Sequence, residues 1–262
     1  MKMNYKTWSL SALVMTATVT CLALAVGHHK KDAAAVQKPV VRQPVRKDTV
    51  YDPSLLGKME SVCREFDFNR RDCSYSGTVN VTDGKDSANT VRDLKFLFCK
   101  AGADFYYQIG NTETIHQDGL HVFIQHEQNK VVLSSPSVAM KTPVADIASL
   151  QKNLRSEKYE LVSHSVGSSR TLSLLNDTHI TCKEFSVSYD TVSGKLQRIF
   201  TRLSDFGDPL NKKNDRVVDI WLRTLEDRGD LALYPSVKDV LYQAGGKWRL
   251  TTKYSGYELI IM

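Results

Sequence analysis

Three histidines could bind a metal ion if the fold brought them together. His116, His121 and His126 are five residues apart, and Asp118-Gly119 between the first two predicts a two-residue hairpin turn. Such a hairpin pairs His116 with His121 on one face of a sheet, and it places His126 and Glu113 on the opposite face. Two imidazoles are fewer ligands than protein metal sites use. We therefore expect two surface histidines and no metal site.

No sequence motif indicates catalysis. The acidic and amide residues between 205 and 215 lack EF-hand spacing and its glutamate at position 12, so they are typical of a polar connection. The chain has no G-x-S-x-G, no H-E-x-x-H, no phosphate-binding glycine loop and no dinucleotide fingerprint. We expect a protein that is not an enzyme, with no catalytic residues and no cofactor.

Four cysteines lie beyond the N-terminal segment, at Cys63, Cys73, Cys99 and Cys182. An even number suits an oxidising compartment, so all four are candidates for disulfide bonds. Cys63 and Cys73 bracket a short connection between a predicted helix and a predicted strand, and they are the preferred pair. Four free, buried thiols are the alternative. No C-x-x-C occurs, so neither a thioredoxin-like motif nor a zinc ribbon is supported.

The N-terminus is typical of an exported protein. Lys2 and Lys6 precede an apolar run over residues 10–26, and Ala23-Leu24-Ala25 resembles a signal-peptidase site. Residues 1–25 are therefore a signal peptide or, alternatively, an N-terminal membrane anchor. Residues 26–50 contain Pro39 and Pro44 without helical or strand periodicity, and they read as a basic, flexible linker.

The net charge of +6 lies wholly in this N-terminal part of the 262-residue chain. Residues 1–48 carry eight basic and two acidic side chains, so residues 49–262 retain 27 of each sign and are neutral. A basic nucleic-acid-binding domain is thereby excluded, and we expect no nucleic-acid partner. The basic segment over residues 1–48 could instead contact the anionic surface of a membrane.

Residues 51–262 read as a single domain made mostly of strands. Asp52-Pro53 is a favourable helix start, and apolar residues at helical spacing follow to Phe66. A second, weaker helix is expected over 143–156, and a short one near Val240 that Gly245-Gly246 closes. Strands are expected over 74–82, 93–100, 104–117, 120–128, 131–134, 159–165, 170–175, 185–189, 196–203 and 216–225, with a last hairpin over 248–254. The fold class is therefore α+β, with an antiparallel sheet and few helices.

Several motifs along these elements resemble the LolA-like family of periplasmic lipoprotein carriers and their relatives LolB, RseB and LppX. They are, in chain order, Tyr75-Ser76-Gly77-Thr78-Val79-Asn80-Val81, Asp104-Phe105-Tyr106-Tyr107, Glu113 to Gly119, Val122-Phe123-Ile124, Lys130-Val131-Val132-Leu133, and Tyr189-Asp190 through Gly194-Lys195-Leu196. Two departures from the family pattern are Tyr106, where the carriers tend to have Arg, and Phe123, where they often have Trp. The resemblance covers roughly residues 51–225 and implies a strongly curved half-barrel sheet with helices over its concave side.

The resemblance also implies a function. A half-barrel of this kind would bind a lipid, an acyl chain or a lipoprotein in the periplasm, as a soluble protein after signal cleavage or as one anchored to the inner membrane. The expected apolar lining is Leu55, Met59, Val62 and Phe66 from the helix, with Val122 and Ile124 from the sheet. The alternative is a structural or interaction subunit of a cell-envelope assembly, tethered to the inner membrane, whose interior is a filled core and whose partner is another envelope protein.

Overall fold

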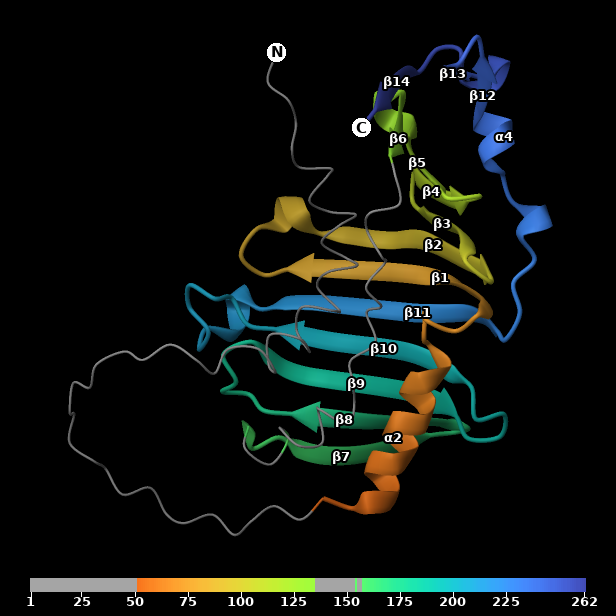
Figure 1. Ribbon diagram of the computed structural model, residues 1–262. Coiled ribbons are helices and arrows are strands. Elements are labelled where there is room, and N and C mark those ends of the chain that lie inside the picture. The colour runs from red at the N-terminus through yellow and green to blue at the C-terminus, as the bar shows by residue number, and fades with distance from the viewer. Residues whose placement is uncertain (1–50, 135–153, 155–156) are drawn as a thin grey trace, which may run out of the picture.

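The computed structural model describes residues 51–134, Leu154 and residues 157–262 (Figure 1). The predicted signal or anchor over 1–25, the linker over 26–50 and nearly all of the helix expected over 143–156 lie outside the described residues. In the described part of the chain, no helix is both long enough and apolar enough to cross a membrane.

Helix α2 (Pro53–Glu65) begins where the sequence predicts. The carboxylate of Asp52 accepts a hydrogen bond from the backbone N–H of Ser54 at 2.8 Å, and Pro53 occupies the first turn, where no N–H is needed. One face of the helix buries Met59, Val62 and Cys63. Because these residues recur at helical spacing, the helix must pack on an apolar surface.

That surface is a sheet of 12 strands that are antiparallel except at one edge. The strands of its first half are β1 (Asp72–Asp83), β2 (Val91–Ala101), β3 (Asp104–Ile109), β4 (Thr112–Gln117), β5 (Leu120–Gln125) and β6 (Lys130–Ser134). Those of its second half are β7 (Glu160–Val166), β8 (Ser169–Leu175), β9 (Cys182–Asp190), β10 (Leu196–Leu203) and β11 (Arg216–Glu226). The last strand, β14 (Glu258–Ile261), returns to pair in parallel with β6.

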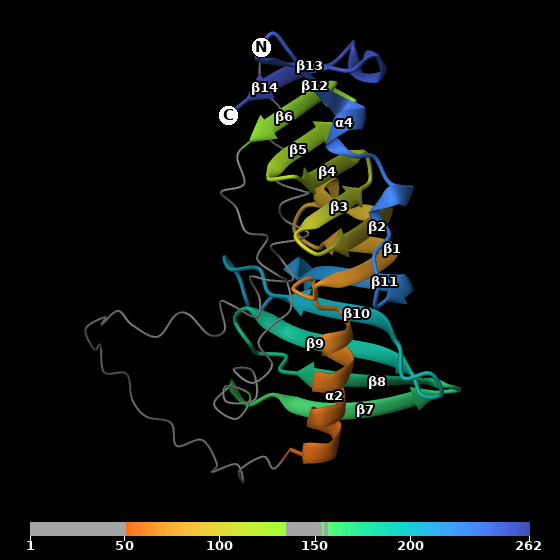
Figure 2. The same cartoon turned by 45° about the vertical axis from the view of Figure 1, so that its right-hand side comes forward.

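Each half of the sheet is an antiparallel meander, and the two meanders meet at its centre. The order is β14-β6-β5-β4-β3-β2-β1-β11-β10-β9-β8-β7, so β1 pairs with β11 although the two strands are far apart in sequence. Figure 2 shows the strands from β2 to β6 rotated relative to β7–β10, as the right-handed twist of strands requires. An antiparallel-rich sheet with few helices agrees with the predicted fold class.

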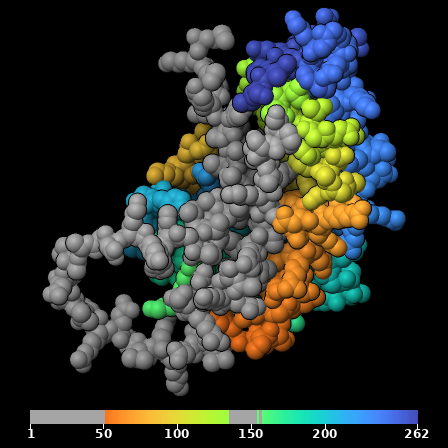
Figure 3. Space-filling view, viewed as in Figure 1, coloured from red at the N-terminus to blue at the C-terminus, as the bar shows by residue number. Residues whose placement is uncertain are grey.

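The two faces of the sheet carry two separate cores. On the first face, which we call the helix-side face, α2 packs against β9 and β10 (Figure 1). On the opposite face, the reverse face, a C-terminal segment covers β3–β6. This segment, residues 231–257, contains two 3-10 turns (Leu231–Leu233 and Thr252–Tyr254) and the short elements α4 (Val237–Val240), β12 (Leu241–Ala244) and β13 (Lys247–Leu250). In the space-filling view these residues, coloured blue, form the outer layer beside the yellow and green strands (Figure 3).

Four predicted elements differ from those observed. His126–Gln128, expected at the end of a strand, and Thr252–Tyr254, expected in the last hairpin, are 3-10 turns. The other two differ at glycines. The single strand expected over 104–117 is two strands, because Gly110, with a φ of 53°, turns the chain back at Gly110-Asn111. Gly245-Gly246, expected to end a helix, forms the turn between β12 and β13 instead. Both positions need a left-handed backbone that glycine adopts without steric cost, and the same residue therefore suits a hairpin turn or a helix end.

Candidate functional site

The helix-side face is apolar well beyond the part that α2 covers. Cross-strand register places Phe98, Tyr107, Thr114, Phe123 and Val132 side by side in one row over β2–β6. The ring of Phe98 lies 6.4 Å from that of Tyr107, centroid to centroid, so the row begins with aromatic contacts.

This row continues the core beneath α2 without interruption. Phe98 packs edge-on against Phe68 at 4.5 Å, and Phe68 in turn lies 4.9 Å from Phe66 at the end of the helix. Phe105 and Tyr107 on β3 pack against the same core but are only partly buried. Burial raises the pKa of the Tyr107 hydroxyl, which indicates an apolar surrounding.

The predicted lining is divided between the two cores. The helix residues Leu55, Met59, Val62 and Phe66 lie in or against the helix-side core. Val122 and Ile124 do not join them, because both are fully buried on the reverse face under the C-terminal segment. Val122 pairs with Ile115 and lies one residue from Phe123, so strand alternation turns it away from α2. On β2–β5, the aromatic residues Phe98, Phe105, Tyr107 and Phe123 lie on the same face as α2 instead.

The four cysteines are buried, and no disulfide bond joins any two of them. The preferred pairing of Cys63 with Cys73 is therefore absent from the structure, in which both are buried thiols as in the alternative. Burial, and next to it the carboxylate of Glu60, raises the pKa of the Cys63 thiol to about 12. Burial likewise raises the pKa values of Cys73 and Cys99. Thiols of this kind are poor nucleophiles, and packing is what they contribute here.

His116 and His121 are direct cross-strand partners, as the Asp118-Gly119 turn predicts. Their ring centroids are 5.9 Å apart, and the ring of Phe105 stacks on His116 at 5.1 Å. Both lie on the helix-side face, in the cross-strand row next to the aromatic one, which also contains Lys100, Phe105 and Ser134. Burial, followed by the neighbouring His116, lowers the pKa of His121. The described residues contain no group of three or more potential metal ligands.

His126 and Glu113 lie on the reverse face, also as predicted. The Nε2 atom of His126 is 2.6 Å from Oε1 of Glu113, and Nδ1 is 2.9 Å from the hydroxyl of Tyr257 in the C-terminal segment. The second carboxylate oxygen of Glu113 accepts a hydrogen bond from Tyr106 at 2.9 Å. This network stabilises the attachment of the C-terminal segment to β3 and β4. Tyr106, the position where the carriers tend to have Arg, is one of its buried members.

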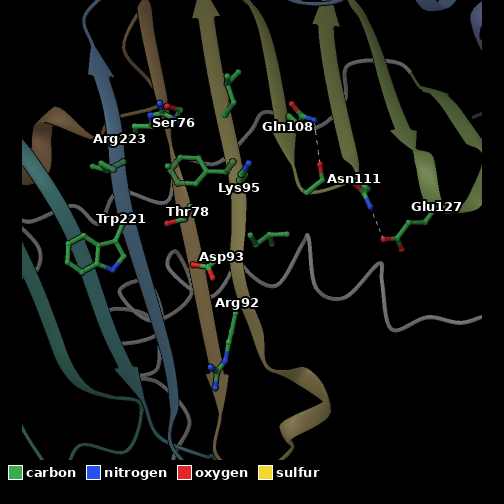
Figure 4. Close-up of a pocket in the computed structure, with 16 residues that line it drawn as sticks. Ser76, Thr78, Arg92, Asp93, Lys95, Gln108, Asn111, Glu127, Trp221 and Arg223 are labelled. Carbon is green, nitrogen blue, oxygen red and sulfur yellow. Dashed lines mark hydrogen bonds between the residues drawn. The ribbon is translucent and has the colours of Figure 1, made fainter.

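A groove of about 740 Å³ crosses the reverse face where the C-terminal segment does not cover it. It runs from Trp221 on β11 across β1 and β2 to the turn between β3 and β4 (Figure 4). Trp221 is 47% exposed, and its indole N–H donates to Asp219 at 3.1 Å while the guanidinium of Arg198 lies 4.8 Å from its ring centroid. These two contacts hold the ring as a fixed, exposed platform.

Cations outnumber anions in this groove. Arg92, Lys95 and Arg223 line it, and none of them forms an ion pair with a described residue. The acidic residues are Asp93 and Glu127, and Glu127 accepts a hydrogen bond from Asn111 at 3.2 Å. No sequence motif pointed to this groove, because its residues come from five elements that only the sheet brings together.

Comparisons with known proteins give only distant likenesses. No protein-family model matches the chain, and no curated protein matches it. Among solved structures, an uncharacterised conserved protein from Thermus thermophilus is similar, with 10% identity and a TM-score of 0.37, over 80% of this chain and 99% of that one. A LolA superfamily protein from Nitrosomonas europaea is similar over 68% of this chain and 96% of that one, with 14% identity and a TM-score of 0.23.

A DUF1329 family protein from Desulfovibrio piger is also similar, over 69% of this chain and 92% of that one, with 14% identity and a TM-score of 0.25. The LolA superfamily protein is a distant structural neighbour. All three TM-scores are below 0.5, so these likenesses do not indicate the function of this chain.

Proposed function

We propose that this chain is a non-enzymatic protein of the cell envelope that binds an acyl chain, of a lipid or a lipoprotein, on its helix-side face. The observation that supports this is the continuous apolar surface on that face. The surface runs from the core beneath α2 to Phe105, Tyr107 and Phe123, which are only partly buried. In this proposal the sheet is a half-barrel, and the ligand lies along its concave side next to α2.

Apolar burial would supply the binding energy. Removing apolar surface from water stabilises a complex by about 25 cal/mol per Å², or about 0.8 kcal/mol for each buried methylene group. A chain of eight to ten methylenes on this face would thus gain roughly 6–8 kcal/mol before the cost of immobilising it. Edge-to-face aromatic clusters such as Phe98 with Phe68 keep their shape, so the surface is formed before the ligand arrives.

The location follows from the N-terminal sequence. An apolar segment over residues 10–26 and the surplus of basic side chains over residues 1–48 favour export and contact with a membrane surface. We place the protein in the periplasm, either soluble after signal cleavage or anchored to the inner membrane. In both cases, the neutral remainder of the chain is available to a lipid ligand.

Titration with a fluorescent fatty acid tests the proposal. In the full-length protein, we expect Phe105→Ala and Tyr107→Ala each to weaken binding about tenfold or more, because each removes about 1.5–3 kcal/mol of apolar contact. Trp221→Ala is the matched control, since it removes an aromatic side chain from the reverse face and should leave the affinity unchanged. The proposal fails if the unsubstituted protein takes up no fatty acid and shows only its apo mass in native mass spectrometry of envelope extracts.

The reverse-face groove favours a second candidate function, that of an interaction subunit in an envelope assembly. Its exposed Trp221 and its cations Arg92, Lys95 and Arg223 are the residue types that dominate protein interfaces or attract acidic partners. If this candidate is right, Trp221→Ala with Arg223→Ala should abolish co-purification of a stable partner. Under the same change, acyl-chain binding on the other face should persist. Equal partner recovery with and without the two substitutions would exclude the groove as the interface.

A further inference from the structure

His116 and His121 differ from two other described histidines in that no carboxylate pairs with them. His126 lies 2.6 Å from Glu113, and His179 lies 3.5 Å from Glu157. Neither the His116 side chain nor the His121 side chain forms a hydrogen bond or an ion pair with a described residue. The contacts that they make are ring contacts with each other and with Phe105.

The charged groups nearest to this histidine pair do not engage the N–H donors of its two imidazoles. In the same cross-strand row, Lys100 on β2 lies beyond Phe105, so the charge on that side is positive. Asp104 precedes Phe105 on β3, and strand alternation therefore places it on the reverse face. Asp118 lies in the turn between the two histidine strands and forms no ion pair with a described residue. An anion at the pair would thus meet two imidazoles that no described carboxylate has already engaged.

The pair also lies at the end of the apolar surface that carries the proposed function. The ring of Phe105 stacks on His116 and lies 6.2 Å from that of His121, centroid to centroid. Phe105 in turn lies 6.0 Å from Phe98, which belongs to the core beneath α2. An acyl chain along this face thus has the two imidazoles at one end.

We propose that His116 and His121 bind the anionic end of an acyl ligand, a carboxylate or a phosphate, and hold it more tightly at mildly acidic pH. This inference rests on the proposed acyl-chain binding and names the chemical class of its ligand. Each imidazole can donate an N–H to an anionic oxygen, and a protonated imidazole adds a charge-assisted hydrogen bond.

The direction of the pH effect follows from the protonation states. An ordinary histidine has a pKa near 6.5, and burial, followed by the neighbouring His116, lowers that of His121, so the His121 ring is mainly neutral above pH 7 in the ligand-free protein. A bound anion favours the charged form and raises the pKa, so binding takes up protons. The affinity must then rise as the pH falls, by up to about tenfold per pH unit for each proton taken up.

Two ligands that differ only at the head group test this in the full-length protein. Dodecyl phosphate remains an anion between pH 5.5 and 7.5, whereas dodecanol is uncharged throughout. We expect dodecyl phosphate to bind at least tenfold more tightly at pH 5.5 than at pH 7.5, and dodecanol to bind equally at both. Dodecanoate should behave like dodecyl phosphate between pH 6.5 and 7.5, and inorganic phosphate alone should bind far more weakly than either.

The variant His116→Gln/His121→Gln should remove the pH dependence and leave dodecanol binding unchanged, which also shows that the variant is folded. His164→Gln, which changes an exposed histidine on β7, is the control and should retain the full pH dependence.

The possible failures are distinguishable. A pH dependence that survives in the double variant, or equal binding of the phosphate and the alcohol, overturns the head-group site and leaves acyl binding standing. If neither amphiphile binds at either pH, the proposed function fails and the head-group site fails with it. Inorganic phosphate that binds as tightly as dodecyl phosphate overturns the inference in favour of a site for a free anion.

Discussion

At the scale of single residues, the ion pair most deeply buried among the described residues contains a lysine of the sheet. Lys183 on β9 has no exposed surface, and its ammonium group lies 2.5 Å from Oδ1 of Asp215. A guanidinium nitrogen of Arg202 lies 3.6 Å from the other oxygen of Asp215. Such a pair contributes little net stability compared with an apolar replacement, yet each partner depends on the other because neither can reach water.

This dependence gives a residue-scale prediction. Lys183→Met should lower the free energy of unfolding by about 3–5 kcal/mol, because it leaves the Asp215 carboxylate buried with only the more distant Arg202. Lys183→Met/Asp215→Leu should restore most of that loss in urea unfolding. Lys212→Met, which breaks an exposed pair with Asp177, is the control and should cost less than about 1 kcal/mol. A double variant as unstable as the single one would contradict this account.

The sequence was informative about residues whose placement depends on neighbours in the chain. The pairing of His116 with His121, and the opposite position of His126, follow from strand alternation and one Asp-Gly turn. The sequence could also show that Val122 and Ile124 share a buried face. What covers that face is a segment more than 100 residues later, and neither periodicity nor turn chemistry encodes such a long-range contact.

At the scale of elements, the junction of β1 with β11 depends on one glycine. The register between these strands shifts between Ser76 and Gly77. A Cβ atom on Gly77 would lie 1.9 Å from the backbone oxygen of Trp221, too close for any side chain. The bulge and the pairing of the two halves of the sheet therefore require glycine at this position.

Two glycine substitutions should thus have opposite effects. Gly77→Ala forces backbone atoms of β1 and β11 apart, and should destabilise the protein by about 3 kcal/mol or more. Gly57→Ala lies within α2 with nothing within 4 Å of the added carbon, and should stabilise the helix by up to about 1 kcal/mol. The unfolding temperatures of the two variants and of the unsubstituted protein test this prediction. If Gly77→Ala unfolds at the same temperature as the unsubstituted protein, the bulge does not require glycine.

Most elements could be predicted from the sequence, because α2 and the strands carry strong local patterns. The boundaries of β10, for example, are those expected. The turn at Gly110-Asn111 was missed because aromatic and β-branched residues, which favour strands, lie on both sides of it. The order of the strands was beyond sequence reasoning, since pairing between β1 and β11 is decided by the whole sheet.

At the scale of the whole molecule, the C-terminal segment covers the reverse face of the first half of the sheet and completes the core on that side. Val240 on α4 and Tyr254 are almost completely buried against β3–β6. The hydrogen bond between Val237 N–H and the side chain of Gln117, and the contact of Tyr257 with His126, attach the segment at two further points. Without it, the reverse side of β4, β5 and β6 would expose an apolar surface.

A charge placed in this core should release the segment. We expect Val240→Asp to reduce the soluble yield and to increase binding of a hydrophobic dye, because a buried carboxylate would have no partner. Tyr242→Asp, two residues further along the chain at a position that is 47% exposed, should leave both measurements unchanged. Similar dye binding by the two variants would mean that the segment does not protect the sheet.

The pairing of β1 with β11 also has a consequence for the time course of folding. Residues 72–83 can form a meander with β2–β6 soon after they leave the ribosome or the translocation channel, since those contacts are local. Strand β11, which pairs with β1 at the centre of the sheet, and the C-terminal segment, which covers the reverse face, lie within residues 216–261 and are synthesised last. Between these two events, the nascent chain presents an unpaired strand edge and an uncovered apolar sheet, which are the features that chaperones recognise. If the chain is exported as we propose, its topology therefore requires that it be protected from aggregation during transit.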